Sequence, residues 1–524
     1  MQKETSTKEK PTLVAKSALL FGSGTLTSRI LGLIRDALIA QILPKDVRDA
    51  WIAAFRLPNF FRRLLGEGGL SVSFIPIFVE TREKGDSEAQ KRLVSGVFSL
   101  LMSVVSFIWL LCFLFMEVIV QYWLGGEGFT SVPGKIEMTI SMGRVMVGFL
   151  FFITLFAYFM ALLNGVKKFG MTGFAPVLLN ISIICGLYYF QDSESIYQVS
   201  AWSVVIGGAL QAIFLFPALV KNKIVPLLSF KYCFDPSVRR VLKKFMPTVF
   251  GVGVLQILTM VNTYFASQLE SGAVSNMYYA DRLLELPLSL IAVSIGTALL
   301  PTLSEHWGKG DKSLFLSCVQ KHFQLFYFLA IPAAVGLWVI GDDIIQVLFV
   351  RGEFSVKDSE TVGSLLQVYS LTLLCVGSLK IFNQSFYASK DTLTPAIISV
   401  CGLVVHMLMA PYWIESLGLQ GLVLSTALIT LFNVVVSVTI LNLRVGSLRW
   451  LAILPHLVKC ITSAGLMGVY LYYIHGLEWK QGRFIIDFPI LLIFVFIAVV
   501  IYFGVSSIFK VEETSKVLSR FKRS

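Results

Sequence analysis

Long apolar stretches recur along the whole chain and alternate with short charged segments. A helix rises 1.5 Å per residue, so roughly 20 apolar residues cross the hydrocarbon core of a bilayer, which is about 30 Å thick. Because backbone polar groups find no water there, helices are the natural spanning elements. The pattern predicts an all-α polytopic membrane protein with about 14 transmembrane helices, at residues 14–43, 48–80, 93–124, 138–164, 172–191, 197–220, 243–268, 274–304, 318–349, 360–388, 393–414, 419–442, 451–475 and 485–509.

The basic residues between these stretches are distributed asymmetrically. Counted over alternate loops and both tails, one side carries 28 Lys and Arg residues and the other carries seven, a fourfold bias. Cytoplasmic loops are enriched in Lys and Arg, so the bias predicts that both termini are cytoplasmic. It also accounts for the net charge of +12, because the excess faces the anionic inner leaflet and not a nucleic acid.

Composition excludes several other classes of protein. Hydrophobic residues make up 56% of the chain and charged residues only 15%, which a large soluble enzyme would not tolerate. The seven cysteines contain no CxxC pair and the five histidines contain no HExxH motif, so we predict neither a metal site nor a catalytic centre, and no cofactor.

The two halves of the chain resemble each other. Residues 53–57, followed by Pro76, resemble residues 279–283, followed by Pro301, and each segment ends near a Lys-Gly-Asp triplet. A second short match relates residues 164–168 to residues 387–391. Two matches at a similar offset favour a duplicated half, the arrangement of two-lobed transporters whose sites lie between the lobes.

Three predicted helices carry charged residues on one face, because steps of three and four residues follow the helical period. Such charges cost about 2.5–3.5 kcal/mol each and usually face a bundle interior or an aqueous cavity. The faces are, in the first helix, Gly22, Thr25, Arg29, Gly32 and Asp36, with Arg35 beside them; in the second, Asp49, Arg56, Asn59, Arg63 and Glu67, with Arg62 at the edge; and in the eighth, Tyr278, Arg282, Glu285 and Ser289, with Asp281 beside them.

Two interpretations of these charges stay open. The charges could pair internally and only pack the helices, and Asp36 and Asp281 are the best candidates for such partners. The set as a whole, however, contains more arginines than acids, and arginine suits planar, bidentate recognition of phosphate. A cationic cavity between lobes favours an anionic cargo, a phosphate or pyrophosphate. Snorkelling of the side chains to the interface accounts for Lys380 and Lys459.

Several segments resemble the MurJ (MviN) family of lipid II flippases, which belongs to the multidrug/oligosaccharidyl-lipid/polysaccharide exporter superfamily. The matching segments occur in family order over most of the chain, and the first block is long and quite specific. They are residues 28–36, Asp49–Ala50, residues 57–63 and 74–76, residues 279–283 with 285–287, residues 348–354, and residues 386–388 with Pro395.

The resemblance implies two pseudo-symmetric six-helix lobes plus two C-terminal helices. The N-lobe would span residues 1–220, a basic cytoplasmic linker 221–242, the C-lobe 243–442, and the two additional helices with a basic tail 443–524. It also implies that the last two helices pass beside a groove for a polyprenyl tail. Carried over by residue, the family's cavity arginines are Arg29, Arg35, Arg62 and Arg282, with Asp36, Asp49, Asp281 and Glu285 as functional acids. Spacing alone supports Arg56 and Arg63 as much as Arg62, whereas the resemblance favours Arg62.

The resulting hypothesis is a lipid II flippase of the bacterial cytoplasmic membrane that works by alternating access. The chain has no Walker A motif, which leaves the membrane potential or a monovalent cation gradient as the driver. Other cell-wall synthesis proteins are expected partners. The alternatives are a multidrug antiporter or a polysaccharide-lipid flippase of the same superfamily and, from other classes, a polytopic glycosyltransferase or a membrane scaffold.

Overall fold

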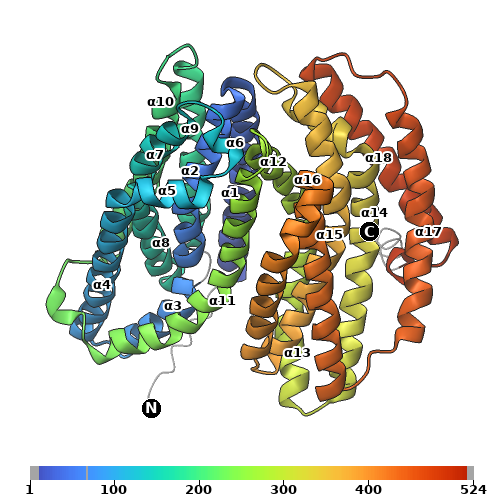
Figure 1. Ribbon diagram of the computed structural model, residues 1–524. Coiled ribbons are helices and arrows are strands. Elements are labelled where there is room, and N and C mark those ends of the chain that lie inside the picture. Colours follow the sequence, from blue (N-terminus) through green and yellow to red (C-terminus); the bar gives the residue numbers. More distant parts are fainter. Residues whose placement is uncertain (1–10, 67–68, 516–524) are drawn as a thin grey trace. The chain divides into compact units, whose positions relative to one another are not determined.

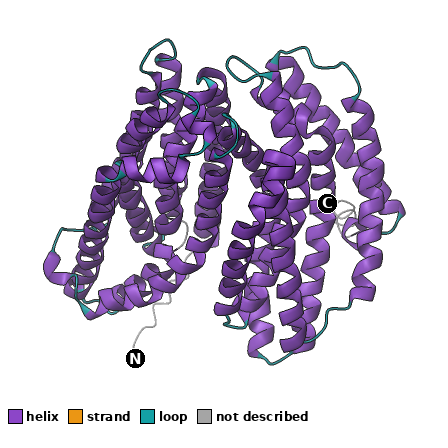
Figure 2. Cartoon of the chain, viewed as in Figure 1, coloured by secondary structure: helices purple, strands orange, loops and turns teal. Residues whose placement is uncertain are grey.

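The computed structural model describes residues 11–66 and 69–515. Every regular element within these ranges is a helix (Figure 1), and the cartoon coloured by secondary structure contains no strand there (Figure 2). The chain divides into two compact units, with the boundary between Ser271 and Gly272. The predicted all-α fold class is therefore confirmed.

Unit 1 contains the helices from α1, which carries Arg29, to α11, the long helix that begins within the predicted linker. Its helices are α1 (Pro11–Ile42), α2 (Lys45–Gly66), α3 (Gly69–Glu83), α4 (Ser87–Leu114), α5 (Met116–Leu124), α6 (Glu127–Thr130), α7 (Lys135–Met146), α8 (Phe149–Gly165), α9 (Phe169–Tyr189), α10 (Ile196–Lys221) and α11 (Pro236–Ser267), with a 3₁₀ turn η1 (Phe230–Tyr232) before α11.

Unit 2 contains the remaining helices, including the last two of the chain. They are α12 (Ala273–Leu288), the π-helical turn η2 (Ser289–Val293), α13 (Ser294–Gly308), α14 (Lys312–Phe349), α15 (Val356–Ala388), α16 (Leu393–Arg444), α17 (Trp450–His475) and α18 (Phe484–Ile508). Continuous helix α16 has a kink at Gly418, whose φ of +57° is left-handed. This kink falls between the predicted helices 393–414 and 419–442.

Ten helices or helical runs are long and apolar enough to cross a membrane within the described residues. Helices α1 and α2, which carry Arg29, Arg35, Asp49 and Arg62, are not among the ten. Each predicted segment coincides with one or more helices of the structure, apart from short turns such as Phe115 and Val147–Gly148, and the protein is a multi-pass membrane protein. The count of fourteen spans stays a prediction.

A close helix crossing positions the first arginine-bearing helix. Helices α1 and α9 pack along much of their length. At their crossing, Gly24 lies against the backbone of Gly173, and a Cβ on Gly24 would come within 2.6 Å of the Gly173 carbonyl carbon. Small residues allow such close approach of two helices in a membrane, where packing replaces the hydrophobic effect as the driving force. The crossing brings the second half of α1 next to Asn180 of α9.

The segment after α10 packs on α4. The backbone amides of Leu227 and Ser229 donate hydrogen bonds to the hydroxyls of Ser95 and Ser99. Helix α11 then begins at Pro236, and the Asp235 side chain caps it by accepting from the Ser237 amide. The predicted linker 221–242 thus contains the first turns of α11. The boundary between the two compact units is set by packing density and not by motion, so the predicted lobe boundaries stay a prediction.

Polar contacts attach the last two helices to the rest of unit 2. The Tyr502 hydroxyl of α18 donates to the Phe328 carbonyl of α14 at 2.7 Å. Near the C-terminal end of α14, the buried carboxylate of Asp343 pairs with His475 at 2.8 Å and with Lys480 at 2.6 Å. A buried carboxylate is stable only when paired, so these contacts fix α17 and the following loop against α14.

The glycine crossing predicts a matched pair of stability effects. Gly24→Ala should destabilise the protein by about 1–3 kcal/mol, because the new methyl group meets backbone that cannot rotate away. Gly22→Ala, two residues earlier in the same helix, should be neutral or slightly stabilising, since nothing lies within 4 Å of its Cβ position. Thermal unfolding of the two variants in detergent measures the difference, and equal midpoints would show that the crossing is not tight.

Candidate functional site

Arg29 and Arg35 of α1 have different environments in unit 1. The two residues are six positions apart on the helix, so the side chains of Arg29 and Arg35 point in different directions. Arg29 is exposed in unit 1, whereas Arg35 is 5% exposed. The resemblance assigns both arginines to the same cavity, but within unit 1 Arg29 is an accessible cation and Arg35 is a buried one.

Arg35 lies in a hydrogen-bonded network. Its Nε and Nη2 donate to Asp36 Oδ1 at 2.9 and 2.6 Å, and its Nη1 donates to Asn180 Oδ1 at 3.0 Å. The Asn180 amide in turn donates to the Ser28 carbonyl at 2.9 Å. Asp36 is fully buried, so each charge of the pair compensates the other. The structure thus contains the internal pairing of Asp36 that the sequence analysis left open.

Helix α2 carries the next group of predicted residues. Arg62 donates from Nε to Asn59 Oδ1 at 2.7 Å, one turn earlier in the helix. Arg56 and Arg63 are half-buried, as Arg62 is. Glu67, which the spacing places on the same face, lies outside the described residues. The structure thus pairs Arg62 with Asn59 and leaves open how Arg56, Arg62 and Arg63 rank.

Asp49, at the start of α2, pairs with a residue that the sequence did not single out. Its Oδ2 is 2.9 Å from Nζ of Lys135, and both side chains are fully buried within unit 1. Lys135 precedes an apolar helix and was counted only as a loop lysine. Its sole sequence signal is an isolated lysine at the first position of a helix, where a cation is unfavourable beside the helix dipole.

In unit 2, Arg282 and Glu285 form an ion pair one turn apart on α12. Nη1 of Arg282 is 3.1 Å from Oε2 of Glu285, and the guanidinium lies over the Tyr278 ring at 5.7 Å. Both charged side chains remain partly exposed, at 31% and 43%. Asp281 is half-buried. The pair can therefore exchange partners with a ligand at little desolvation cost.

Two further features of this region were not predicted. Lys380 of α15 is half-buried and lies close enough to Glu285 for their charges to interact, while its snorkelling to the interface stays a prediction. The helix after α12 widens into the π turn η2 directly after Pro287. Such turns occur where a helix absorbs local strain, often at functional sites. Periodicity places Lys380 on a helix but does not identify its neighbour.

The predicted site residues are divided between the two units. Unit 1 holds Arg29, Arg35, Arg62, Asp36, Asp49, Arg56, Asn59 and Arg63, and unit 2 holds Arg282, Asp281 and Glu285. A central cavity shared by both lobes, and the substrate contacts of these residues, stay predictions. Among the described residues, no group of three or more His, Cys, Asp and Glu side chains could hold a metal ion.

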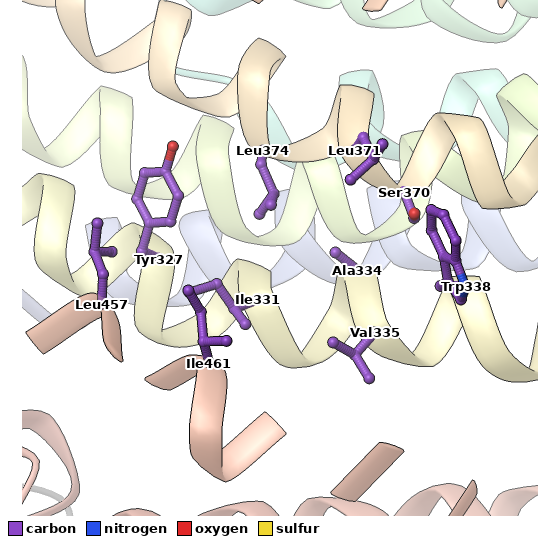
Figure 3. Close-up of a pocket in the computed structure, with 10 residues that line it drawn as sticks. All are labelled: Tyr327, Ile331, Ala334, Val335, Trp338, Ser370, Leu371, Leu374, Leu457 and Ile461. Atoms are coloured by element: carbon purple, nitrogen blue, oxygen red, sulfur yellow. The ribbon is translucent and has the colours of Figure 1, made fainter. Parts of the chain in front are cut away.

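An apolar cavity lies between helices α14, α15 and α17 of unit 2. Its volume is about 290 Å³. Figure 3 shows the side chains that three helices contribute to it: Tyr327, Ile331, Ala334, Val335 and Trp338 from α14, Ser370, Leu371 and Leu374 from α15, and Leu457 and Ile461 from α17. Almost all of this lining is hydrocarbon, which suits an aliphatic chain.

Comparison with known proteins decides the family. The family model described as lipid II flippase MurJ matches residues 39–496. The chain belongs to this family. A probable lipid II flippase MurJ of Bdellovibrio bacteriovorus is 38% identical over 512 residues, which cover 97% of each chain. The lipid II flippase MurJ of Burkholderia cenocepacia is 34% identical over 417 residues, 78% of this chain and 80% of the relative.

Solved structures agree with the MurJ assignment. A lipid II flippase MurJ in an inward closed conformation superposes with a TM-score of 0.78 at 25% identity, over 94% of this chain and 98% of that one. An inward-facing multidrug resistance MATE family transporter of the MOP superfamily gives a TM-score of 0.70 at 14% identity, over 82% of this chain and 98% of that one. The second likeness shows a shared fold.

The Arg35–Asp36 pair predicts a non-additive stability effect. Asp36→Leu should lower the free energy of unfolding by about 3–5 kcal/mol, because the buried guanidinium loses its nearest counter-charge. The double variant Arg35→Leu with Asp36→Leu should be less destabilised than Asp36→Leu, since no buried charge remains at this pair. Thermal unfolding in detergent tests this, and additive losses would refute a coupled pair.

Proposed function

We propose that this chain flips lipid II, the activity of its family, and that its intramembrane arginines bind the lipid's pyrophosphate. The observation that carries the proposal is the excess of cations over acids on α1 and α2, together with Arg282 on α12, in a MurJ family member. Charged side chains within a membrane usually face an interior or aqueous space and serve function. A pyrophosphate needs several cationic donors, and this chain has them.

The arginines divide into two roles. Arg29, Arg62 and Arg282 retain exposed surface within their units, so a phosphate oxygen can reach their guanidinium groups. Guanidinium binds phosphate through two parallel hydrogen bonds, which lysine does not reproduce. Arg35 is held by Asp36 and Asn180, and it acts by shaping α1 and adding positive potential.

Exchange of partners accounts for reversible binding. Glu285 pairs with Arg282 across a partly exposed surface, where such a pair contributes about 0–1 kcal/mol. A substrate phosphate can therefore replace Glu285, and the carboxylate retains Lys380 as an alternative partner. When the substrate leaves, Glu285 returns to Arg282. The acids thus keep the cavity from holding the pyrophosphate too tightly.

The apolar cavity of unit 2 supplies a place for the lipid tail. A polyprenyl chain is all hydrocarbon, and the cavity between α14, α15 and α17 offers it an apolar surface inside a helix bundle. Holding the tail here and the pyrophosphate on the arginines would let the hydrophilic head group cross through the protein. The tail meanwhile stays in hydrocarbon, which avoids the cost of exposing it to water.

The transport cycle follows from these parts. The two lobes expose the pyrophosphate site alternately to the cytoplasm and to the outside, and the membrane potential or a monovalent cation gradient drives the change. We place the protein in the bacterial cytoplasmic membrane with both termini in the cytoplasm, on the strength of the fourfold bias of loop Lys and Arg. Cell-wall synthesis enzymes that make and use lipid II are its expected partners.

The alternatives fit less well. A multidrug antiporter shares the fold, but a site for cationic drugs favours an excess of acids, whereas the helices here carry an excess of arginine. A polysaccharide-lipid flippase would also bind a pyrophosphate, but the family match separates the two. A polytopic glycosyltransferase or a scaffold has no use for an arginine cluster within its helices.

Substitution of single arginines tests the phosphate-binding role. Arg29→Ala and Arg282→Ala should each slow lipid II flipping about tenfold or more, since a hydrogen bond to a charged group contributes about 1.5–3 kcal/mol. Arg29→Lys should recover only part of the rate. The rate is measured in cells that depend on this chain, as the appearance of lipid II to a membrane-impermeant probe.

Arg92→Ala is the matched control, because Arg92 is exposed on α4 at the predicted cytoplasmic surface. It should flip lipid II normally. Expression and monodispersity are checked for every variant. Normal flipping by Arg29→Ala, Arg35→Ala and Arg282→Ala together would exclude the phosphate-binding role.

A further inference from the structure

Lys135 is a fully enclosed cation of unit 1. Its side chain is fully buried, and Nζ lies 2.9 Å from Asp49 Oδ2, 3.3 Å from Asp46 Oδ1, 2.7 Å from the Gly128 carbonyl and 2.7 Å from Ser271 Oγ. The Phe129 ring lies on another side, 4.4 Å away. A buried ammonium is tolerated only with such compensation. Four oxygens surround Lys135 as they would surround a small bound cation.

The four oxygens come from three segments that are distant in sequence. Asp46 and Asp49 lie in the first turns of α2, Gly128 belongs to α6, and Ser271 is the last residue of unit 1, directly before α12. The Ser271 hydroxyl also donates to Asp46. We call Lys135 and these four oxygen groups the Lys135 cluster. It ties α2 and the α6–α7 segment to the point where the chain leaves unit 1.

Backbone packing reinforces the same junction. A Cβ on Gly126 would lie 2.6 Å from Cα of Gln268, so the chain around α6 lies directly on the end of α11. The Trp123 indole donates a hydrogen bond to the Met260 carbonyl at 3.0 Å, and Met260 lies about two turns before the end of α11. Ser267 of α11 is fully buried beneath this contact. The loop charges predict that this end of unit 1 faces the outside.

We propose that Lys135 is a tethered cation that closes the outer end of unit 1 and is released when the chain opens to the outside. The inference rests on the proposed flipping cycle, in which this end must open to let the head group out. While the end is closed, Lys135 neutralises Asp46 and Asp49 and holds α11 against α2. Separating the fully buried charges of Lys135 and Asp49 is costly while the end is closed, whereas water entering an opened end solvates both. Asp49 then acts as part of an external closure and not as a substrate contact.

Accessibility of Ser267 measures whether the end is closed. In a chain whose seven cysteines are replaced by alanine, Ser267→Cys adds one buried thiol beneath the Lys135 cluster. The chain is reconstituted into liposomes, and a membrane-impermeant maleimide is added to the outer side. We expect slow labelling with Lys135 present and at least about tenfold faster labelling with Lys135→Ala, because the buried carboxylate of Asp49 and the partly exposed carboxylate of Asp46 then lose their shared cation.

A rescue experiment separates a tethered cation from a merely structural contact. Lys135→Ala leaves the oxygens of Asp46, Asp49, Gly128 and Ser271, which are ligands that hard cations prefer. Sodium chloride should therefore slow the labelling of Lys135→Ala and leave the parent chain unchanged. N-methylglucamine chloride at the same ionic strength should have no effect on either chain. Equal labelling of Lys135→Ala in the two salts would overturn the inference.

Two variants keep the test decisive if Lys135→Ala folds poorly. Ser271→Ala removes one oxygen and retains both carboxylates, so it should speed labelling less and in the same direction. Lys357→Ala, an exposed lysine of the same predicted side, should label as the parent does. If neither Ser271→Ala nor Lys135→Ala changes the labelling rate, the proposed closure by Lys135 is contradicted. The two proposals fail separately. Failure of the parent chain to flip lipid II would refute the proposed function, but it would not alter these labelling rates.

Discussion

The cost of a charge in a membrane governs the organisation of this protein. A lysine or arginine within a helix must either meet a counter-charge, meet water or bind a ligand. The described helices contain two of these solutions side by side. Asp36 and Asn180 hold Arg35, and four oxygens hold Lys135, whereas Arg29 and Arg282 keep surface exposed within their units. The buried cations stabilise helix packing, and the accessible ones are left to bind.

Helix packing determines which arginine takes which role. Gly24 and Gly173 allow α1 and α9 to cross closely, and that crossing brings Asn180 within reach of Arg35. Arg29 lies on another face of α1 and is not covered by α9 to the same degree. The glycine contact therefore bears on the proposed function, since it helps to enclose Arg35 while Arg29 stays exposed within unit 1.

Much of the fold could be predicted from the sequence, because apolar length and helical period depend on local residues. The helices, the family and the candidate arginines follow from such patterns. The partners do not: spacing placed Asp49 on a face with Arg56 and Arg63, while the structure pairs it with Lys135, 86 residues later. Spacing also did not indicate that Lys380 of α15 lies close enough to Glu285 of α12 for their charges to interact. Long-range contacts depend on which helices pack together, and one sequence does not contain that information in readable form.

The central claim is that this chain moves a pyrophosphate-linked lipid to the outer leaflet. Its most direct test is depletion of the chain in cells that have no second lipid II flippase, with lipid II measured in total and on the outer face. The account predicts that total lipid II rises while its accessibility to an impermeant probe falls, before growth stops. Unchanged accessibility on the outer face after depletion would contradict it.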